Sequence, residues 1–471
     1  MCRVHDLSTG INQMNDTAAI SNKKRYKPLI YFVASLVIAL VLTWILKEPG
    51  FTDSQVYTLF LLFFSMGLWI TEAIPPFAVS LFILAYLVFT FGNPHLNSAP
   101  EKIDRYVNTF SSSIIWLLLG GFFLASAMKK TGLDIRLLAL TLRISGNKPK
   151  NILIALMCTT WIASMVMSDS ATTTMVLAAI TPLLKRLGRS NFSKALLLGI
   201  SIAAVTGGMA TIISNSTNAV VAGLIDEAGI KINFLDWVIF GFPISLVLTS
   251  ICCYVLVRLF TKEADWISVD FLDNTQDASR SQRTIVLVVL IVTVLFWVTG
   301  SIHGITVAAT CAIPIVVLTV TGILTAADIR TMPWDTLLLV AGGLSLGQAL
   351  QSTGLLNHYT SHIKAMNDHP VLFIATLSYI AMIFANVGSS TAACMLLIPL
   401  GMSVLPEWKI ETAMSIGISS AASVFLPISV PANIIVYSSG LMQQKDFRIG
   451  GLILGVLGPF LILLWMLLLR G

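Results

Sequence analysis

Two short clusters of hydroxyl side chains lie in otherwise apolar sequence and have the chemistry to bind an anion. Ser168-Asp169-Ser170 interrupts one apolar stretch, and Ser389-Ser390-Thr391 interrupts another 221 residues later (389 − 168). Hydroxyls and the free N–H groups at a helix start donate hydrogen bonds to oxyanions. Polar groups at membrane depth are costly and are tolerated mainly where they line a site. We therefore interpret both clusters as tips of helical hairpins that hold a small anion.

The same residue types also cap helices, so each tip has a purely structural alternative. One tip alone would leave the two interpretations equally balanced. Two tips at matching positions favour a binding site.

Asp169 is the only acidic residue between Asp134 and Asp226. A carboxylate at membrane depth needs a proton, a cation or strong donors. An ionised Asp169 would also repel an anionic substrate. We therefore expect Asp169 to carry a proton or to bind a coupling cation, with helix capping as the alternative.

A second pair of polar breaks follows the tips, from Gly207 to Asn218 and from Ala422 to Asn433. Glycine and proline interrupt a helix and free its carbonyl oxygens, which together with a side-chain amide suit a cation such as sodium. A packing kink is the alternative. The candidate cation ligands are Asp169, Gly207, Thr211, Asn218, Ser390, Ala432 and Asn433.

Composition identifies an integral membrane protein. Only 11% of the 471 residues are charged and 56% are hydrophobic, whereas about 25% of a soluble chain is charged. The formal net charge of +6 is explained by basic residues that orient the chain in the membrane, and we do not attribute it to nucleic-acid binding. We find no Cys or His spacing typical of a metal site and no catalytic motif, so we expect a lipid-embedded protein that is not an enzyme.

The predicted fold is an all-α polytopic membrane protein with about 11 transmembrane helices and two re-entrant hairpins. We divide the chain into a cytoplasmic tail (1–27), a first helix and first repeat (28–258), a polar linker (259–283) and a second repeat (284–470). The hairpins are predicted at 150–188 and 370–404. Single spans are predicted at 28–46, 55–73, 76–93, 110–130, 234–258, 284–301, 303–323, 334–352 and 449–469, and further interrupted stretches at 196–228 and 411–443.

Internal similarity indicates a duplication. Residues 120–133 and 342–355 are identical at seven of fourteen positions, although chance similarity between Gly- and Leu-rich spans is the alternative. Basic residues flank the first hairpin on both sides and are sparse around the second. By the positive-inside rule the two repeats are inverted, the N-terminus is cytoplasmic and the C-terminus lies outside.

The first hairpin has an alternative interpretation as two complete spans, 151–167 and 171–187, joined by a tight turn. That arrangement gives the same flanking topology. It requires a turn of Ser-Asp-Ser without glycine or proline, so we favour the re-entrant hairpin.

Together, the tips and broken helices resemble the divalent anion:sodium symporter family. The resemblance covers about 28–470 and rests on the tips, on Gly207 to Asn218, and on Pro427 with Pro431-Ala432-Asn433. The family's tip motif is Ser-Asn-Thr, whereas this chain has Asp169 and Ser390 in place of the two Asn residues. The resemblance implies a homodimer with a moving transport domain and a fixed scaffold. It also implies that the tips contact substrate carboxylates and that nearby backbone carbonyls bind sodium.

We therefore predict a secondary active transporter in the cell membrane that moves small organic anions, C4-dicarboxylates above all, by alternating access. Sodium ions or protons are the expected coupling ions, and no other cofactor is expected. Alternatives are an anion exchanger, a carrier of tricarboxylates or of an oxyanion such as sulfate, and a channel-like pore. The predicted substrate ligands are Ser168, Asp169, Ser170, Ser389, Ser390, Thr391 and Pro431.

Overall fold

The computed structural model of the chain describes residues 27–98, 100–261, 279–360 and 368–470. These residues form helices joined by short connections, and none of them forms a strand. Eight of the described helices are long and apolar enough to cross a membrane, beginning with Lys27–Leu46. The predicted all-α membrane fold is confirmed. Most of the predicted tail (1–27) and linker (259–283) lies outside the described residues.

The first half runs from the N-terminal helix to a long helix that precedes the linker. Its helices are α2 (Asp53–Thr71), α3 (Pro76–Phe91), α4 (Asp104–Val107), η1 (Asn108–Ser111), α5 (Ser113–Thr131), α6 (Leu133–Ser145), α7 (Pro149–Ser164), α8 (Asp169–Leu187), α9 (Asn191–Met209), η2 (Ile212–Ser214), α10 (Ser216–Glu227) and α11 (Phe234–Phe260).

The second half begins after the linker and ends near the C-terminus. Its helices are α12 (Arg280–Val298), α13 (Gly300–His303), α14 (Val307–Thr310), α15 (Ala312–Val320), α16 (Ala326–Arg330), α17 (Trp334–Ser352), α18 (Leu355–Thr360), α19 (Pro370–Val387), α20 (Ser390–Val404), η4 (Pro406–Trp408), α21 (Lys409–Ala421), α22 (Pro431–Tyr437), η5 (Gln444–Phe447), α23 (Arg448–Leu452), the π-turn η6 (Ile453–Leu457) and α24 (Gly458–Arg470).

Two predicted spans are less regular than expected. The span 303–323 is helical only from Val307 to Val320, as α14 and α15, and α13 ends at His303. Gly304 ends α13 in the left-handed region at φ 69°, where residues with a side chain rarely lie. The last span, 449–469, contains the π-turn η6. The sequence also gave no indication of the short amphipathic helix α6, which follows α5 after a left-handed turn at Gly132 (φ 64°).

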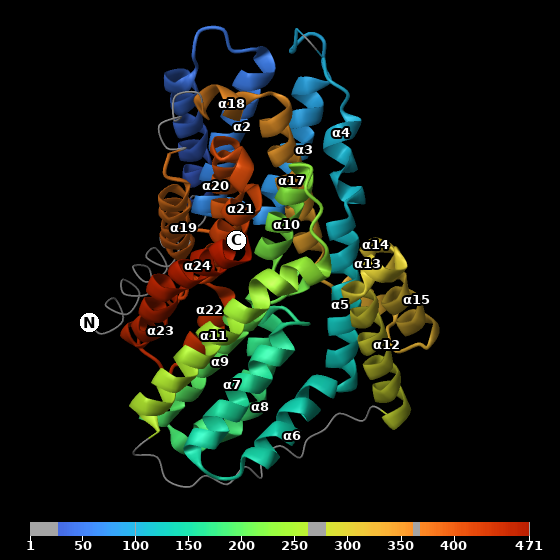
Figure 1. The fold of residues 1–471 in the computed structure, drawn as a ribbon, viewed down its shortest axis with the longest axis vertical. Helices are drawn as coiled ribbons and strands as arrows, with labels where there is room; N and C mark the ends of the chain where they lie inside the picture. Colours follow the sequence, from blue (N-terminus) through green and yellow to red (C-terminus); the bar gives the residue numbers. More distant parts are fainter. Residues whose placement is uncertain (1–26, 99, 262–278, 361–367, 471) are drawn as a thin grey trace, which may run out of the picture.

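The two predicted hairpins and the two breaks lie where the polar clusters interrupt the helices. The chain leaves α7 at Ser164 and enters α8 at Asp169; in the second half it leaves α19 at Val387 and enters α20 at Ser390. In Figure 1 the α7–α8 hairpin occupies the lower half of the molecule and the α19–α20 hairpin the upper half. The order of hairpin, helix, break and half-helix is the same in both halves.

The later half-helix of each break packs against the hairpin of the other half. Helix α10 lies against α20 and α21, and α22 lies against α8 and α9. These paired contacts bring two segments that are far apart in the sequence into one core (Figure 1). Close packing within the first half holds its break in place, because a Cβ on Gly207 would lie 2.4 Å from the carbonyl oxygen of Trp161.

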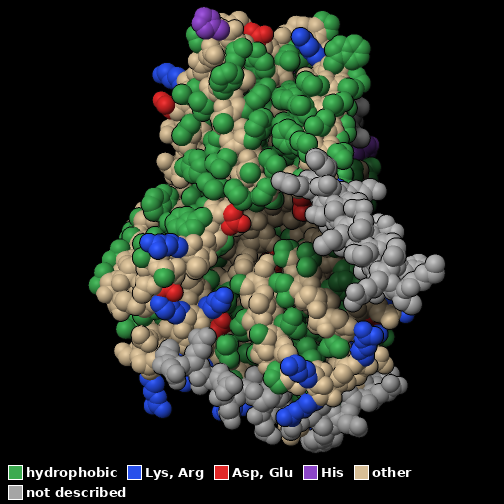
Figure 2. All heavy atoms as spheres, turned by 180° about the vertical axis from the view of Figure 1, so that it is seen from behind, with side chains coloured by type: hydrophobic (Ala, Val, Ile, Leu, Met, Phe, Trp, Pro, Cys, Tyr) green, Lys and Arg blue, Asp and Glu red, His purple; other side chains and the backbone are tan. Residues whose placement is uncertain are grey.

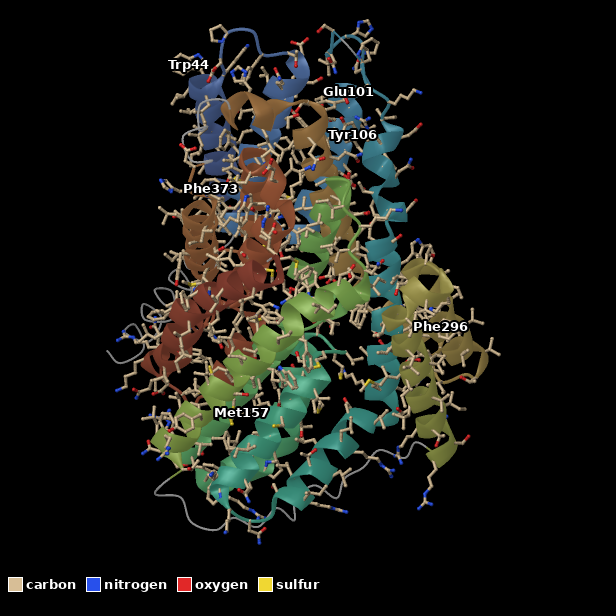
Figure 3. The ribbon with its side chains drawn as sticks, viewed as in Figure 1. Trp44, Glu101, Tyr106, Met157, Phe296 and Phe373 are labelled. Atoms are coloured by element: carbon tan, nitrogen blue, oxygen red, sulfur yellow. The ribbon has the colours of Figure 1, made fainter. Side chains whose placement is uncertain are left out.

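A second group of helices surrounds this core. Helix α3 packs closely on α17, where a Cβ on Gly342 would lie 2.5 Å from the Cα of Ser80. The buried Tyr106 links the segment before α5 to the end of α17 through hydrogen bonds with Glu101 (2.6 Å) and Ser352 (3.0 Å) (Figure 3). Trp44 on the first helix projects away from the protein with 81% of its surface exposed, as expected for a side chain that faces lipid.

Basic residues gather at one end of the molecule. Figure 2 shows Lys and Arg side chains at the lower end and a largely hydrophobic surface above them. We call this end, where α7 begins and α8 ends, the basic end; it carries Lys148, Lys150, Lys185, Arg186 and Arg189.

Candidate functional site

The first tip is built by the start of α8. The Ser168 hydroxyl accepts a hydrogen bond from the N–H of Ala171 (3.3 Å) and so caps the helix. The Asp169 carboxylate is buried, and its Oδ1 accepts from the N–H (2.7 Å) and the hydroxyl (3.2 Å) of Ser170. Asp169 also faces the first break, since a Cβ on Gly208 would lie 3.9 Å from the Asp169 Cβ. The acid therefore lies between the tip and the broken helix.

The second tip has the same local geometry without the acid. The Ser389 hydroxyl caps α20 by accepting from the N–H of Ala392 (3.4 Å). The side chains of Ser390 and Thr391 follow in the first turn, and Thr391 is buried. Capping uses one acceptor lone pair of the hydroxyl oxygen in Ser168 and in Ser389. The proton of each hydroxyl can still be donated to another group.

The first break is held by the Asn218 amide. Its Nδ2 donates to the carbonyl oxygens of Gly208 (2.7 Å) and Thr211 (2.8 Å). The hydroxyl of Ser214 donates to the same Gly208 carbonyl at 2.5 Å. The Asn218 Oδ1 is buried and has no hydrogen-bond partner within the part of the chain that the structure describes. A buried acceptor without a donor is costly, and it is the type of atom that a sodium ion would use.

The second break repeats this arrangement through Asn433. Its Nδ2 donates to the carbonyls of Val424 (3.0 Å) and Leu426 (2.8 Å). In both halves one of the two carbonyls lies seven residues before the Asn. The Asn433 Oδ1 differs from that of Asn218, because it accepts from the hydroxyl of Ser201 on α9 at 2.5 Å.

Each break is also tied to the hairpin of its own half. The Thr211 hydroxyl donates to the carbonyl of Met165 (2.5 Å), three residues before Ser168. The Ser429 hydroxyl contacts the carbonyl of Asn386 (3.2 Å), three residues before Ser389. The two halves therefore use the same backbone position to join tip and break.

The first break also contacts the tip of the other half. The Thr217 hydroxyl lies 3.1 Å from the hydroxyls of both Ser390 and Thr391. Thr211 contacts the first hairpin six residues earlier on the same break. The first break therefore contacts both the first hairpin and the second tip. Asp169 and Thr391 are buried, and the tip residues Ser168, Ser170, Ser389 and Ser390 are half-buried.

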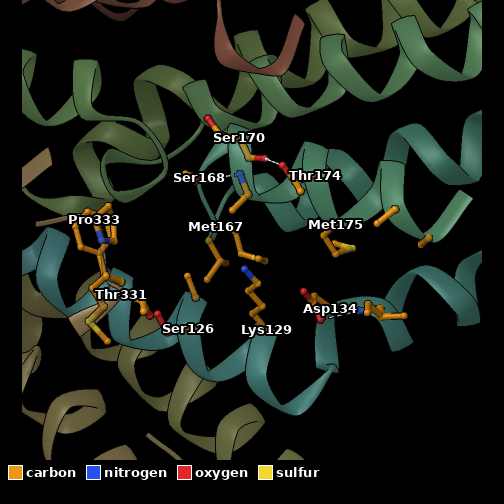
Figure 4. A pocket seen from close by; sticks show the side chains of 18 of the residues that line it. Ser126, Lys129, Asp134, Met167, Ser168, Ser170, Thr174, Met175, Thr331 and Pro333 are labelled. Atoms are coloured by element: carbon orange, nitrogen blue, oxygen red, sulfur yellow. Dashed lines mark hydrogen bonds between the residues drawn. The ribbon is translucent and has the colours of Figure 1, made fainter. Parts of the chain in front are cut away.

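A cavity of about 780 Å³ reaches the first tip. Figure 4 shows Ser168 and Ser170 at one end of this space, with Lys129 and Asp134 on the wall formed by α5 and α6. Its lining residues include Phe122, Ser126, Val166, Met167, Ala171, Thr174, Met175, Ile213 and Met332. Ser389, Ser390 and Thr391 do not line this cavity.

The remaining predicted ligands have other surroundings. Gly207 packs against the Trp161 backbone, so the absence of a side chain there has a packing reason. Pro431 is the first residue of α22 and is exposed, whereas Ala432 is buried. Helix α22 lies against α8, the helix that begins at Asp169.

Sequence reasoning missed two side chains that build the site. Asn386 accepts from the N–H of Phe425 (2.9 Å) and from the Ser429 hydroxyl (2.9 Å), and it thereby fixes the second break. An amide within the apolar α19, three residues before Ser389, was the available signal. Ser201 lies within an apolar helix and gave no such signal. No cluster of three or more metal-ligating side chains occurs among the described residues.

The chain is similar to proteins that are named as transporters. Residues 66–415 match the family model CitMHS, described as citrate transporter. A sodium-dependent dicarboxylate transporter, SdcS of Staphylococcus saprophyticus, is 24% identical over 94% of this chain and 92% of its own length. The inorganic phosphate transporter PHO87 of Saccharomyces cerevisiae is 28% identical over 72% of this chain, which spans only 37% of the yeast protein.

Among solved structures, the Alcanivorax borkumensis YdaH transporter has a similar fold. It aligns with a TM-score of 0.57 at 17% identity and covers 84% of this chain and 98% of its own. At this identity the likeness concerns the fold alone.

Proposed function

This chain belongs to the CitMHS citrate transporter family, and on that premise we propose that it carries small organic anions, C4-dicarboxylates above all, by coupling to sodium ions or protons. It is a multi-pass membrane transporter and not an enzyme. The family resemblance indicated by the hairpin and Asn motifs is confirmed. The substrate and the coupling ion are the parts that we propose.

The proposal rests on the contacts that the first break makes with the first hairpin and with the second tip. Thr217 joins that break to Ser390 and Thr391, and Thr211 joins it to the first hairpin. The N-termini of α8 and α20 carry partial positive charge and short hydroxyl donors. Two such donor groups that share one segment suit an anion with two carboxylates.

The substrate ligands proposed from the sequence remain Ser168, Asp169, Ser170, Ser389, Ser390, Thr391 and Pro431. Ser168 and Ser170 line the cavity and are accessible to a solute from that side. Asp169 is buried beside them, so a dicarboxylate would meet like charge unless a cation or proton is present. This electrostatic requirement is the physical basis of the proposed coupling.

We place the first cation site at Asp169, Gly207, Thr211 and Asn218. The unpartnered Asn218 Oδ1 supports this site. A second site at Ser390, Ala432 and Asn433 has less support, because the Asn433 Oδ1 already accepts from Ser201. We therefore propose that coupling depends chiefly on the first half.

In the proposed cycle a cation or proton neutralises Asp169, the anion binds, and the loaded site is exposed alternately to the two sides. The first half and second half would form an inverted repeat, and the protein would act as a homodimer. The gathering of basic side chains at the basic end supports a cytoplasmic position for that end.

An inorganic oxyanion is the second candidate substrate, and the phosphate transporter among the relatives favours it. The experiment is uptake into proteoliposomes of radiolabelled succinate, citrate, sulfate and phosphate, with and without sodium, at pH 6 and pH 8. We expect succinate uptake that needs a sodium or proton gradient. Uptake that needs only internal anion would establish an exchanger, and currents far above carrier rates would establish a pore; either result would overturn the coupled mechanism.

A further inference from the structure

A second cavity, of about 460 Å³, lies among the ends of α10, α17 and α20. It is also lined by Leu356 of α18 and by Lys409, the first residue of α21. In Figure 1, α18 lies at the upper end of the molecule, whereas α6, which lines the cavity at the first tip, lies at the lower, basic end. No ligand proposed above is among the described residues that line the second cavity.

The second cavity is lined by the counterparts of helices that line the first. Helices α5, α6 and α8 contribute to the first cavity, and α17, α18 and α20 contribute to the second. Four pairs of lining positions correspond at the offsets of the internal similarity: Lys129 and Gln351 (351 − 129 = 222), Asp134 and Leu356 (356 − 134 = 222), Ala178 and Pro399 (399 − 178 = 221), and Pro182 and Ser403 (403 − 182 = 221). The two cavities therefore occupy equivalent places in the two halves.

Each cavity has one lysine and one carboxylate among the described residues that line it. In the first cavity these charges come from α5 and α6. The equivalent positions of the second cavity, Gln351 and Leu356, are uncharged. Its charges come instead from Glu227 at the end of α10 and Lys409 at the start of α21, and both residues are half-buried. Charged groups thus line both cavities although the repeat does not carry them over.

Packed side chains separate the second cavity from the second tip. Along α20, Pro399 follows Ser390 by nine residues (399 − 390), which is about 13 Å of helix. Between these two positions, a Cβ on Gly343 of α17 would overlap the side chain of Met395. The first cavity, in contrast, reaches Ser168 at the first tip. The protein is therefore open to the tips from the first cavity and closed from the second.

We propose that the second cavity is the opening of the transport path at the end opposite the basic end, and that Lys409 attracts the anion into it. This inference rests on the proposed anion transport. The charge of Lys409 raises the local concentration of the anion, and ionised Glu227 lowers it. Gln351 and Ser403 add neutral hydrogen-bond donors to the lining. In the opposite conformation α17 and α20 separate at Met395, and the second cavity then reaches the second tip.

The first test measures the half-saturating concentration of labelled succinate, citrate and phosphate in right-side-out and inside-out membrane vesicles of the full-length protein at pH 8. For K409Q we expect about a fivefold increase, the size expected for one charge in a wet cavity. For E227Q we expect a decrease of about the same size. Both changes should occur in the one vesicle orientation that presents the second cavity to the labelled anion, and K409R should restore most of the affinity.

K102Q is the matched control for the charge variants. Lys102 is exposed, does not line the cavity, and follows Glu101, which Figure 3 shows at the upper end. An exposed charge outside the cavity is screened by salt, so K102Q should change the half-saturating concentration less than twofold.

The second test places a thiol in each cavity, with S403C in the second and A178C in the first. A membrane-impermeant maleimide should modify S403C from one vesicle orientation and A178C from the other. Wild-type protein gives the background from its six native cysteines. Addition of sodium and succinate should change the two modification rates in opposite directions, because only one cavity is open to the tips at a time.

Three results would overturn this inference while the proposed function stands. They are a K409Q value equal to wild type in both orientations, charge effects of equal size in both orientations, and modification of S403C and A178C from the same side. Wild-type vesicles that carry none of the three anions would overturn the proposed function and this inference together.

Discussion

The hydroxyls of Thr217 and Thr391 lie 3.1 Å apart, although 174 residues separate them in the sequence. Thr217 lies in the first turn of α10, and Thr391 lies in the first turn of α20, the second helix of the second hairpin. Both side chains are buried. This pair joins the two halves of the molecule at the proposed anion site.

The Thr217 bridge can be tested by removing its hydroxyl at constant shape. In Thr217→Val the half-buried hydroxyl of Ser390 and the buried hydroxyl of Thr391 lose a partner, which costs about 1–3 kcal/mol. We expect a lower thermal midpoint and at least a tenfold loss of transport rate. Thr376→Val is the control, because Thr376 is exposed on α19 and its hydroxyl contacts only its own helix. Equal behaviour of the two variants would contradict a joining role for Thr217.

The coupling role of Asp169 predicts a selective effect of Asp169→Asn. Asn keeps an oxygen that can accept from Ser170 but cannot carry a proton or a negative charge. We expect the sodium and pH dependence of uptake to change while the ranking of succinate, citrate and phosphate stays the same. Uptake measured across sodium concentrations and pH values checks this. An unchanged sodium and pH profile would rule out the coupling role.

The two break amides should differ in their effect on cation dependence. Asn218→Ala and Asn433→Ala each remove two hydrogen bonds to break carbonyls, so we expect both to lower the thermal midpoint. Of these two amides, Asn218 is the one whose Oδ1 has no hydrogen-bond partner among the described residues. Stabilisation by added sodium, read as the shift in midpoint, should therefore disappear in Asn218→Ala and persist in Asn433→Ala. Loss of the shift in Asn433→Ala alone would contradict this assignment.

Stability should fall with rising pH because of Glu227 at the end of α10. Burial and the neighbouring Asp226 raise the pKa of Glu227 from 4.5 to about 7, against the opposing charge of Arg105. A raised carboxyl pKa gives stability that is complete below pH 4.5 and is lost as the pH rises through about 7. Glu227→Gln should therefore be more stable than wild type at pH 8, with little difference at pH 5.

Thermal midpoints at both pH values provide the measurement for Glu227. Glu407→Gln is the matched control, because Glu407 is exposed on η4. A wild-type midpoint at pH 8 in Glu227→Gln would show that the carboxyl does not titrate in this range.

Local sequence predicted the breaks because the residues that cause them lie within the breaks. Pro427 lies in the second break and Pro431 is the first residue of α22, whereas Gly207 lies within α9, two residues before that helix ends at Met209. Asn386 and Ser201 were missed because their importance comes from partners on other elements, Ser429 and Asn433. No periodicity within α19 or α9 carries that information.

Two elements outside the tips and breaks, the span 303–323 and helix α6, also differ from the prediction. The span 303–323 looks continuous by hydropathy, yet its helical part begins only at Val307, because the left-handed Gly304 ends α13 near the start of this stretch. No element was predicted where α6 lies, and Asp134, Arg136 and Arg143 interrupt the apolar residues of this helix. Its buried face becomes evident only once α5, α7 and α8 are packed around it. The cavity wall opposite the first tip was therefore not predictable from the sequence.

The most direct test of the central claim is a cryo-electron microscopy structure with saturating succinate and sodium. We predict one succinate in contact with Ser168 or Ser170 from the first tip and with Ser389, Ser390 or Thr391 from the second. Succinate bound away from both tips, or the two tips separated at opposite surfaces of the protein, would contradict it.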